Sequence, residues 1–365
     1  MINLKSSLTL LSALASLVMS SLLNASTINL KSGHNKANFA QGDGAGIDIL
    51  VLEDKNSAGV SVNRFSTFHV SGETLYIYNG VASSDGSVVA NQDSAKTVII
   101  SADTISLESN IKVIGYPTNI IFQSSNSSSI NCHSCSFENV GRVTFIKGNY
   151  SLTNNAVSNL TTTSNGSIII NNLTAPGTLA VDVIAESMSL SGLIDTNMKA
   201  DIHPEKGMIV NEAGTKTVGS GGVYLYPGRF TLGYRDYALV SATPTSAKTI
   251  SANINSAMIN IVSPNTITVS NDVTLNTASD ALATATLDGS FYTPKEGVFI
   301  SAIKNTSANI NIFGTLISDN KVGLKAFNNL TLKSSSTLVS GLAELIAGKT
   351  TYTEGNLQVT KLESG

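Results

Sequence analysis

The sequence predicts an all-β protein built as a solenoid of stacked coils, and three observations lead to that prediction. Charged residues make up 13% of the 365-residue chain, and tryptophan is absent. That charged share is about half the share of an average globular protein. Short runs of alternating aliphatic residues recur, with Asn, Ser, Gly and Asp between them. Several runs also resemble one another at a loose spacing of about two dozen residues. Because β-branched residues fit a pleated surface and Asn fits turns, the mixture favours strands.

The strand-like runs carry Ile, Val or Leu in alternation. They are Thr97–Ile100, Asn119–Phe122, Ser167–Ile170, Ala180–Ala185, Met258–Val262, Thr266–Val269, Asn309–Phe313 and Leu330–Leu332. Many short strands with regular turn signals are typical of an all-β fold, which could be a sandwich, a barrel or a solenoid. Amphipathic helical periodicity is nearly missing, and Leu338–Ala347 is the one run that fits a short helix.

Four longer units favour the solenoid, because each has a small residue, a polar step and then Ile/Leu alternation. They cover residues 101–107, 184–194, 250–262 and 300–317. In a parallel β-helix each coil contributes inward-facing aliphatic residues that stack on those of the next coil. The repeats are degenerate, so on this pattern alone a large sandwich stays open as the alternative.

Two regions are expected to depart from regular coils. The ends of a solenoid pair with other molecules unless they are capped, so Ser26–Leu52 is predicted to form an N-terminal cap. Residues 199–237 fit a coil poorly and are predicted to form lateral hairpins or another excursion on the side of the rod. They include the aromatic residues Tyr224, Tyr226, Phe230, Tyr234 and Tyr237. With the Asn/Ser/Thr-rich faces, this aromatic cluster is a candidate adhesive surface, and a plain solvated face is the alternative.

The N-terminus carries the features of a secretory signal peptide. Lys5 precedes an apolar run from Leu8 to Leu23, and Ala25 offers a small residue for cleavage. The run is shorter than the ~20 residues of a membrane span, and serines interrupt it. Residues 1–25 are therefore predicted to be a signal peptide that exports the chain to the periplasm.

Cys132-His133-Ser134-Cys135 is the sharpest local motif, and three interpretations compete for it. A redox C-x-x-C needs a helix N-terminus, and a zinc site needs four ligands, whereas the surroundings here are strand and turn. A local disulfide between Cys132 and Cys135 fits an even cysteine count in an oxidising compartment and is the favoured interpretation.

No catalytic, cofactor or metal site is predicted elsewhere. The four histidines, His34, His69, His133 and His203, are scattered outside any recognisable catalytic pattern. The local carboxylate pairs are Asp43 with Asp48, Glu53 with Asp54, and Asp201 with Glu205. A net charge of −3 and a pI near 5.8 do not indicate the basic surface that nucleic-acid binding needs.

Two ordered motifs resemble the N-terminal secretion domain of two-partner-secretion exoproteins, the haemagglutinin/haemolysin family. The first, within Asn56–Val70, matches at Asn56, Ala58, Gly59, Val60, Ser61, Asn63, Phe68 and Val70. The second matches at Asn126, Ile130, Cys132, Cys135, Phe137, Asn139, Arg142 and Gly148. Where the family has Pro-Asn-Gly after the first Asn of the second motif, this chain has Ser127-Ser128-Ser129. The family sets a tight turn there, and serines would make it looser.

The resemblance implies a right-handed parallel β-helix with a secretion domain over residues 26–270 and further coils over 271–365. It also implies recognition by an outer-membrane transporter with periplasmic POTRA domains, followed by release from, or display on, a Gram-negative cell. The implied role is an adhesin or haemolysin-like factor without catalysis, with a host-cell glycan or protein as receptor. Two alternatives are a carbohydrate-active β-helix enzyme, which needs paired carboxylates across a cleft, and an autotransporter passenger.

Overall fold

The computed structural model describes residues 26–31, 38–40, 47–82, 88–89, 94–197, 209–210, 216–217, 221–234, 238–277 and 296–364. The predicted signal peptide (1–25), His34, Asp43, Asp201, His203, Glu205 and Tyr237 lie outside these ranges. All regular structure in the described residues is β-strand. No helix among them is long and apolar enough to cross a membrane.

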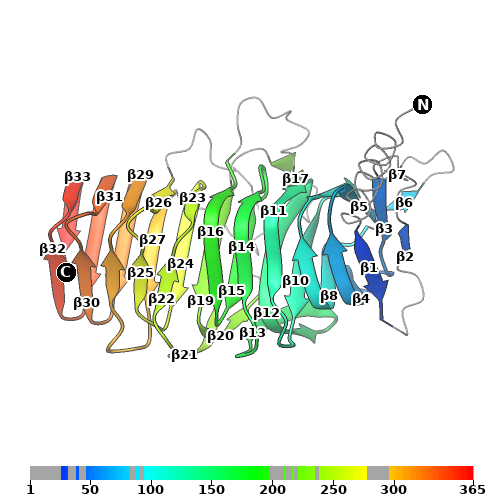
Figure 1. Ribbon diagram of the computed structural model, residues 1–365, viewed down its shortest axis with the longest axis horizontal. Helices are drawn as coiled ribbons and strands as arrows, with labels where there is room; N and C mark the ends of the chain where they lie inside the picture. The colour runs from blue at the N-terminus through cyan, green and yellow to red at the C-terminus, as the bar shows by residue number, and fades with distance from the viewer. Residues whose placement is uncertain are drawn as a thin grey trace, which may run out of the picture.

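The chain forms a parallel β-helix, in which successive coils stack along the axis of a rod (Figure 1). Leu316 pairs with Leu338 and Val298 pairs with Val322, so a coil without an insertion takes 22 residues (338 minus 316) to 24 residues (322 minus 298). Coils with an insertion are longer, as where Val181 pairs with Val223. The expected spacing of about two dozen residues is therefore confirmed. Each predicted strand run overlaps an observed strand.

The coils have three faces, and each face is a ladder of parallel strands. Face 1 runs through the first part of β4 (Val60–Val70) and of β8 (Thr97–Leu107), then β10 (Thr118–Ser124), β12 (Val140–Thr153), β15 (Ala180–Ala185), β19 (Gly222–Pro227), β24 (Met258–Ser263), β27 (Gly297–Ala302) and the second part of β29 (Thr315–Ala326), of β31 (Thr337–Ala347) and of β33 (Asn356–Ser364).

Face 2 carries the second part of β4 and β8, then β11 (Ile130–Glu138), β14 (Ile168–Thr174), β16 (Met188–Asp195), β22 (Lys248–Ile250), β25 (Ile267–Val269), β28 (Ile310–Ile312), β30 (Asn329–Leu332) and β32 (Thr350–Thr353). Face 3 carries β3 (Ile47–Val51), β5 (Thr74–Asn79), β9 (Asn110–Gly115), the ends of β11, β14 and β16, then β23 (Asn253–Asn255), β26 (Thr274–Asn276) and the first parts of β29, β31 and β33.

A cap covers the N-terminal end, as predicted. β1 (Thr27–Leu30) pairs antiparallel with β4, and β2 (Asn38–Ala40) pairs antiparallel with β3. These strands occupy edges that would otherwise be open to other chains. Two short pairs form separate antiparallel sheets: β6 (Val81–Ala82) with β7 (Val88–Val89), and β17 (Ile209–Val210) with β18 (Lys216–Thr217).

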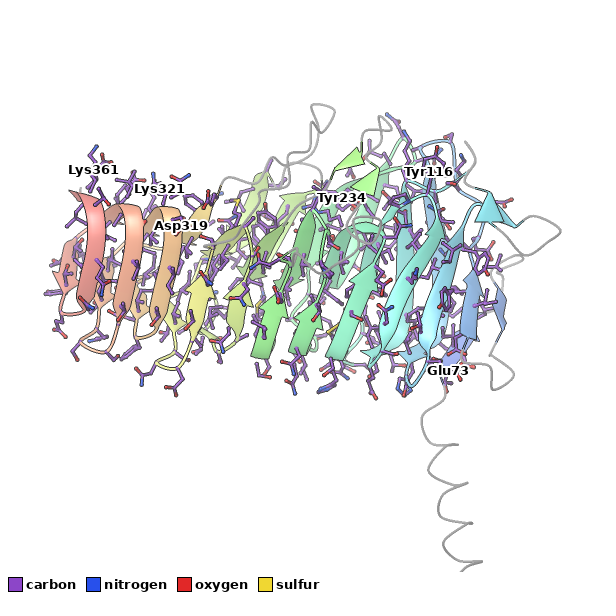
Figure 2. All side chains as sticks on the ribbon, turned by 90° about the horizontal axis from the view of Figure 1, so that it is seen from above. Glu73, Tyr116, Tyr234, Asp319, Lys321 and Lys361 are labelled. Carbon is purple, nitrogen blue, oxygen red and sulfur yellow. A yellow bond between two sulfur atoms is a disulfide. The ribbon has the colours of Figure 1, made fainter. Side chains whose placement is uncertain are left out.

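Aliphatic and aromatic side chains fill the interior of the rod in one continuous core. Five phenylalanines form a contact chain inside the N-terminal coils, with neighbouring ring centroids 5.1–6.1 Å apart: Phe65, Phe68, Phe122, Phe137 and Phe145. Lys321 and Lys361 lie on the C-terminal coils (Figure 2). Lys321 pairs with Glu344, and Lys361 pairs with Glu363 at 2.5 Å.

A second sheet lies on the outside of face 1. It consists of the outer part of β12 (Gly148–Thr153), β13 (Ala156–Thr162), β20 (Arg229–Gly233) and β21 (Leu239–Thr243), all antiparallel. We call it the lateral sheet. Its side chains and the outward-facing residues of face 1 form a separate hydrophobic core. Lateral hairpins were predicted, but their location within 199–237 was only partly right, because β19 is a regular coil strand.

Two further expectations are wrong. Leu338–Ala347 is not a helix but most of strand β31, which pairs in register with β29. The described aromatic residues at 224–234 do not form an exposed adhesive surface. Tyr224, Tyr226, Phe230 and Tyr234 are between 0% and 4% exposed and fill the core beneath the lateral sheet.

Candidate functional site

The first motif begins with a turn that Asn56 closes. Its Oδ1 accepts hydrogen bonds from the backbone N–H groups of Ala58 and Val60, each at 3.0 Å. Gly59 has a φ of +79°, which a residue with a Cβ adopts only with strain. A Cβ there would also lie 3.1 Å from Cγ of Lys96. Turn geometry thus explains why the motif has Asn at position 56 and Gly at position 59.

Ser61 and Asn63 are polar side chains inside the first coil. Both are fully buried, and they pair with Val98 and Ile100, which face the core. Ser61 Oγ donates to the Glu53 carbonyl at 2.7 Å, and Asn63 Oδ1 accepts from the Glu53 N–H at 2.8 Å. Buried backbone groups need partners, so the two side chains satisfy the segment that joins β3 to β4.

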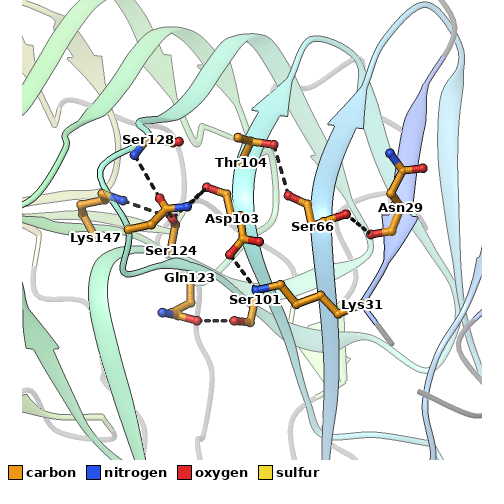
Figure 3. A network of polar contacts seen from close by, with 11 residues as sticks. Asn29, Lys31, Ser66, Ser101, Asp103, Thr104, Gln123, Ser124, Ser128 and Lys147 are labelled. Carbon is orange, nitrogen blue, oxygen red and sulfur yellow. Dashed lines mark hydrogen bonds and ion pairs between the residues drawn. The ribbon is translucent and has the colours of Figure 1, made fainter. Parts of the chain in front are cut away.

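The second motif begins with a turn that Asn126 closes; its partners Ser128 and Asp103 are labelled in Figure 3. Asn126 Oδ1 accepts from the Ser128 N–H at 3.0 Å, and its Nδ2 donates to the Asp103 carbonyl at 2.5 Å. Asp103 in turn forms an ion pair with Lys31 of the cap at 2.7 Å. The side chain of Asn126 therefore closes the Ser127–Ser129 turn, and Asp103 connects this turn to the N-terminal cap.

Lys147 lies behind this turn, inside the rod. It is fully buried, and its Nζ donates to Ser124 Oγ at 3.1 Å. Burial lowers its pKa from 10.5 to about 8. Gly166 packs against the stem, since a Cβ there would lie 2.5 Å from Lys147 Cε. Sequence analysis missed this residue, although a lysine directly after the apolar run Val143–Ile146 was a visible signal.

The cysteine motif lies at a corner of a coil within β11. Cys132 and Cys135 form a disulfide, with their Cα atoms 5.4 Å apart, and both side chains face the core. The alternation of buried residues shifts at His133 and Ser134, which are exposed, and Ser134 has a φ of +54°. The bond thus spans a bend in the strand, with Ile130 buried on one side.

Phe137 and Asn139 continue the coil. Phe137 contacts Phe122 and Phe145 and so joins the interior phenylalanines, as does Phe68 of the first motif. Asn139 has a φ of +56°, and its Nδ2 donates to the carbonyls of Val113 and Gly115 at 2.9 and 3.2 Å. Asn139 forms the turn between two faces, and its side chain connects this turn to the preceding coil.

Arg142 forms a buried ion pair beneath the lateral sheet. Its Nε and Nη2 donate to Asp182 Oδ2 and Oδ1 at 2.6 and 3.2 Å, and the two side chains are 3% and 0% exposed. Thr144 Oγ1 also donates to Asp182 at 2.8 Å. Tyr234, which follows β20, places its ring 5.6 Å from the guanidinium carbon. Asp182 was missed, although a carboxylate within the apolar run Ala180–Ala185 is unusual.

The two motifs meet through the lateral sheet. Asn56 Nδ2 donates to the Asn155 carbonyl at 2.8 Å, and Asn155 Nδ2 donates to Ser57 Oγ at 2.9 Å. Asn154 and Asn155 form the two-residue turn between β12 and β13, with φ of +51° and +65°. Both values suit the type I′ turn that such a hairpin prefers. Strand β12 carries Arg142 as well as this hairpin.

Most motif residues thus hold the coils, the cap and the lateral sheet together. The more accessible parts are the turns at Ser57 and at Asn126–Ser129. Of the histidines, His69 lies 3.5 Å from a Glu108 carboxylate oxygen, and His133 is exposed. Within the described ranges, no three His, Cys, Asp or Glu side chains gather closely enough to hold a metal ion.

No family model matches this sequence, and no curated protein matches it either. Among the solved structures that are similar to this chain is the crystal structure of a filamentous hemagglutinin secretion domain. The similarity has a TM-score of 0.53 at 15% identity and covers 93% of this chain and 99% of that chain. At this identity it establishes a shared fold.

Proposed function

We propose that this chain is a secreted or surface-exposed exoprotein whose residues 26–270 act as a two-partner-secretion module. In this proposal an outer-membrane transporter with POTRA domains recognises the chain in the periplasm and passes it outward. The observation that carries the proposal is the fold shared with a filamentous hemagglutinin secretion domain over 93% of this chain. The two sequence motifs support it, because they occur in family order and meet at the lateral sheet.

The coil architecture suits such a route. Each coil stacks mainly on its neighbour, so coils that fold outside the cell would favour outward movement without ATP. The role after export that we propose is an adhesin or haemolysin-like factor without catalysis. Its receptor would be a host-cell glycan or protein.

The test is export from a Gram-negative host with and without a candidate transporter, measured as protein in the medium or on the cell surface. Two variants make the test sharper. Replacing Ser127–Ser129 with Pro-Asn-Gly restores the family's turn and keeps the N–H of residue 128, which Asn126 uses. Lys349→Met, an exposed position on a distant coil, is the matched control.

We expect export only with the transporter, more of it for the Pro-Asn-Gly variant, and no change for Lys349→Met. Equal periplasmic retention of all three chains in both strains would reject the proposal. Equal export of all three chains without any transporter would reject it as well. Transporter-dependent export that ignores the turn exchange would keep the route and exclude this turn as the contact.

A further inference from the structure

The ladder of face 2 is interrupted at one step in the described chain. Strand β16 pairs with β14, and β22 pairs with β25, but β16 and β22 do not pair with each other along residues 188–190 and 248–250. The other two faces stay paired across the same two coils, through Ala180 with Gly222 and Leu193 with Asn253. The two coils are therefore held together at Leu193 and Asn253, but β16 and β22 separate over residues 188–190 and 248–250. This leaves a wedge between the two strands.

The lateral sheet explains the interruption. In the preceding coil, Ala185 of face 1 is followed almost at once by Met188 of face 2. In this coil, strands β20 and β21 are inserted between β19 and β22. The chain thus reaches β22 from the lateral sheet, not around the usual corner, which separates it from β16.

A pocket of about 240 Å³ occupies the wedge. Hydroxyl groups dominate its lining, together with one lysine: Ser187, Ser189, Ser246, Thr249, Ser251 and Lys248. The hydroxyls of Ser187, Ser189 and Ser251 make no hydrogen bond to another residue that the structure describes. All three serines are exposed, whereas Leu190, Lys248 and Ile250 in the same strands are buried.

Lys248 is the charged group of this pocket. It is only 9% exposed, and its Nζ donates to Ser246 Oγ at 3.1 Å. The nearby carboxylate of Glu186 is already engaged with Arg229 Nε at 2.6 Å. Desolvation lowers the pKa of Lys248, and the charge of Glu186 acts against that shift. Among the described residues, no carboxylate forms a salt bridge with Lys248.

We propose that the wedge between β16 and β22 binds a small oxyanion, held by the Lys248 ammonium together with the hydroxyl of Ser246. An ammonium has three donors, and only one is directed to a protein oxygen here. Hydrogen bonds between charged groups are stronger than neutral ones, and a buried charge is favoured when it is paired. A sulfate, a phosphate or a carboxylate offers the acceptors that this site lacks.

The test is calorimetric titration of the full chain with sulfate, phosphate and acetate at constant ionic strength, with chloride as the balancing ion. The three probes distinguish a tetrahedral from a planar ligand. We expect saturable binding of at least one, weakened about tenfold or more by Lys248→Met, because the charge-assisted hydrogen bond is lost. Lys349→Met should bind as the wild type does, and rising pH should weaken binding as the ammonium loses its proton.

Ser246→Ala is a second variant that keeps the charge, and it should bind more weakly than the wild type by a smaller factor. Melting curves would show that each variant is folded, and Lys248→Gln replaces Lys248→Met if the latter is not. Equal affinity of the wild type and the Lys248 variant would overturn the proposal. The absence of saturable binding for all three probes would overturn it too.

Discussion

The buried Lys147 offers the sharpest test of how this rod is stabilised. The structure places its ammonium inside the coil with Ser124 Oγ as hydrogen-bond partner. The pKa falls from 10.5 to about 8 because burial disfavours the charged form. Each pKa unit is worth about 1.4 kcal/mol, so keeping this amine charged costs the folded state about 3 kcal/mol at neutral pH.

The sign of the pH dependence follows from the two protonation states. Below about pH 8 the amine is charged in both the folded and the unfolded chain, and the full penalty is present. Between about pH 8 and 10.5 the folded amine is neutral while the unfolded amine keeps its proton. Stability therefore rises with pH across this window, since the unfolded state binds more protons.

The perturbation is Lys147→Met, which keeps a long unbranched side chain and removes the charge. We expect the variant to be more stable than the wild type at pH 7, with the gap closing by pH 10.5. Denaturant unfolding at both pH values measures this, and the difference between the two chains cancels every other titrating group. Lys325→Met, at an exposed position, is the control and should follow the wild type. A wild type and a Lys147→Met variant that respond identically to pH would refute the reasoning.

Three further predictions concern the lateral sheet and the disulfide. Asp182→Asn leaves Arg142 buried without its counter-charge, so we expect the free energy of unfolding to fall by about 3–5 kcal/mol and the lateral sheet to be digested faster by protease. An unchanged melting temperature would contradict a role of the buried pair in stability. Asn155→Ala puts alanine at a positive φ that asparagine tolerates better, and it removes the bond to Ser57. This should cost about 1–3 kcal/mol in melting experiments, and Asn155→Gly should lose less. Reducing the Cys132–Cys135 bond should lower stability by less than ~3 kcal/mol, because the closed loop is very short. Loss of cooperative unfolding on reduction would show that the bond does more than hold one bend.

The fold class could be predicted because stacked coils repeat their pattern. Alternating aliphatic residues and small polar corners recur once per coil, and they identified eight strands of the rod: β8, β10, β14, β15, β24, β25, β28 and β30. The segment Leu338–Ala347 was misread because Ala343, Glu344 and Leu345 favour a helix locally. Pairing with β29 and β33 on either side outweighs that local preference.

The lateral sheet could not be derived from local sequence. Its strands come from residues 148–162, 229–233 and 239–243, and their pairing depends on contacts between distant segments. The burial of Tyr224 and Tyr226 follows from that sheet, so their exposure was misjudged with it. The buried groups Asp182 and Lys147 carry a signal of their own, which is a charge within or directly after an apolar run.

The hydrogen bonds between Asn56, Ser57 and Asn155 influence the order in which the coils of the rod unfold. Coils that touch only their neighbours behave like a row of units that can be removed one at a time. The hairpin turn reaches back to the first coil, and β20 and β21 add a segment from beyond residue 228 to the same sheet. The coils from β4 to β19 are therefore bound into one cooperative block, whereas the later coils can unfold one at a time. Pulled from its C-terminal end, the chain would yield in small steps first and then in one large event.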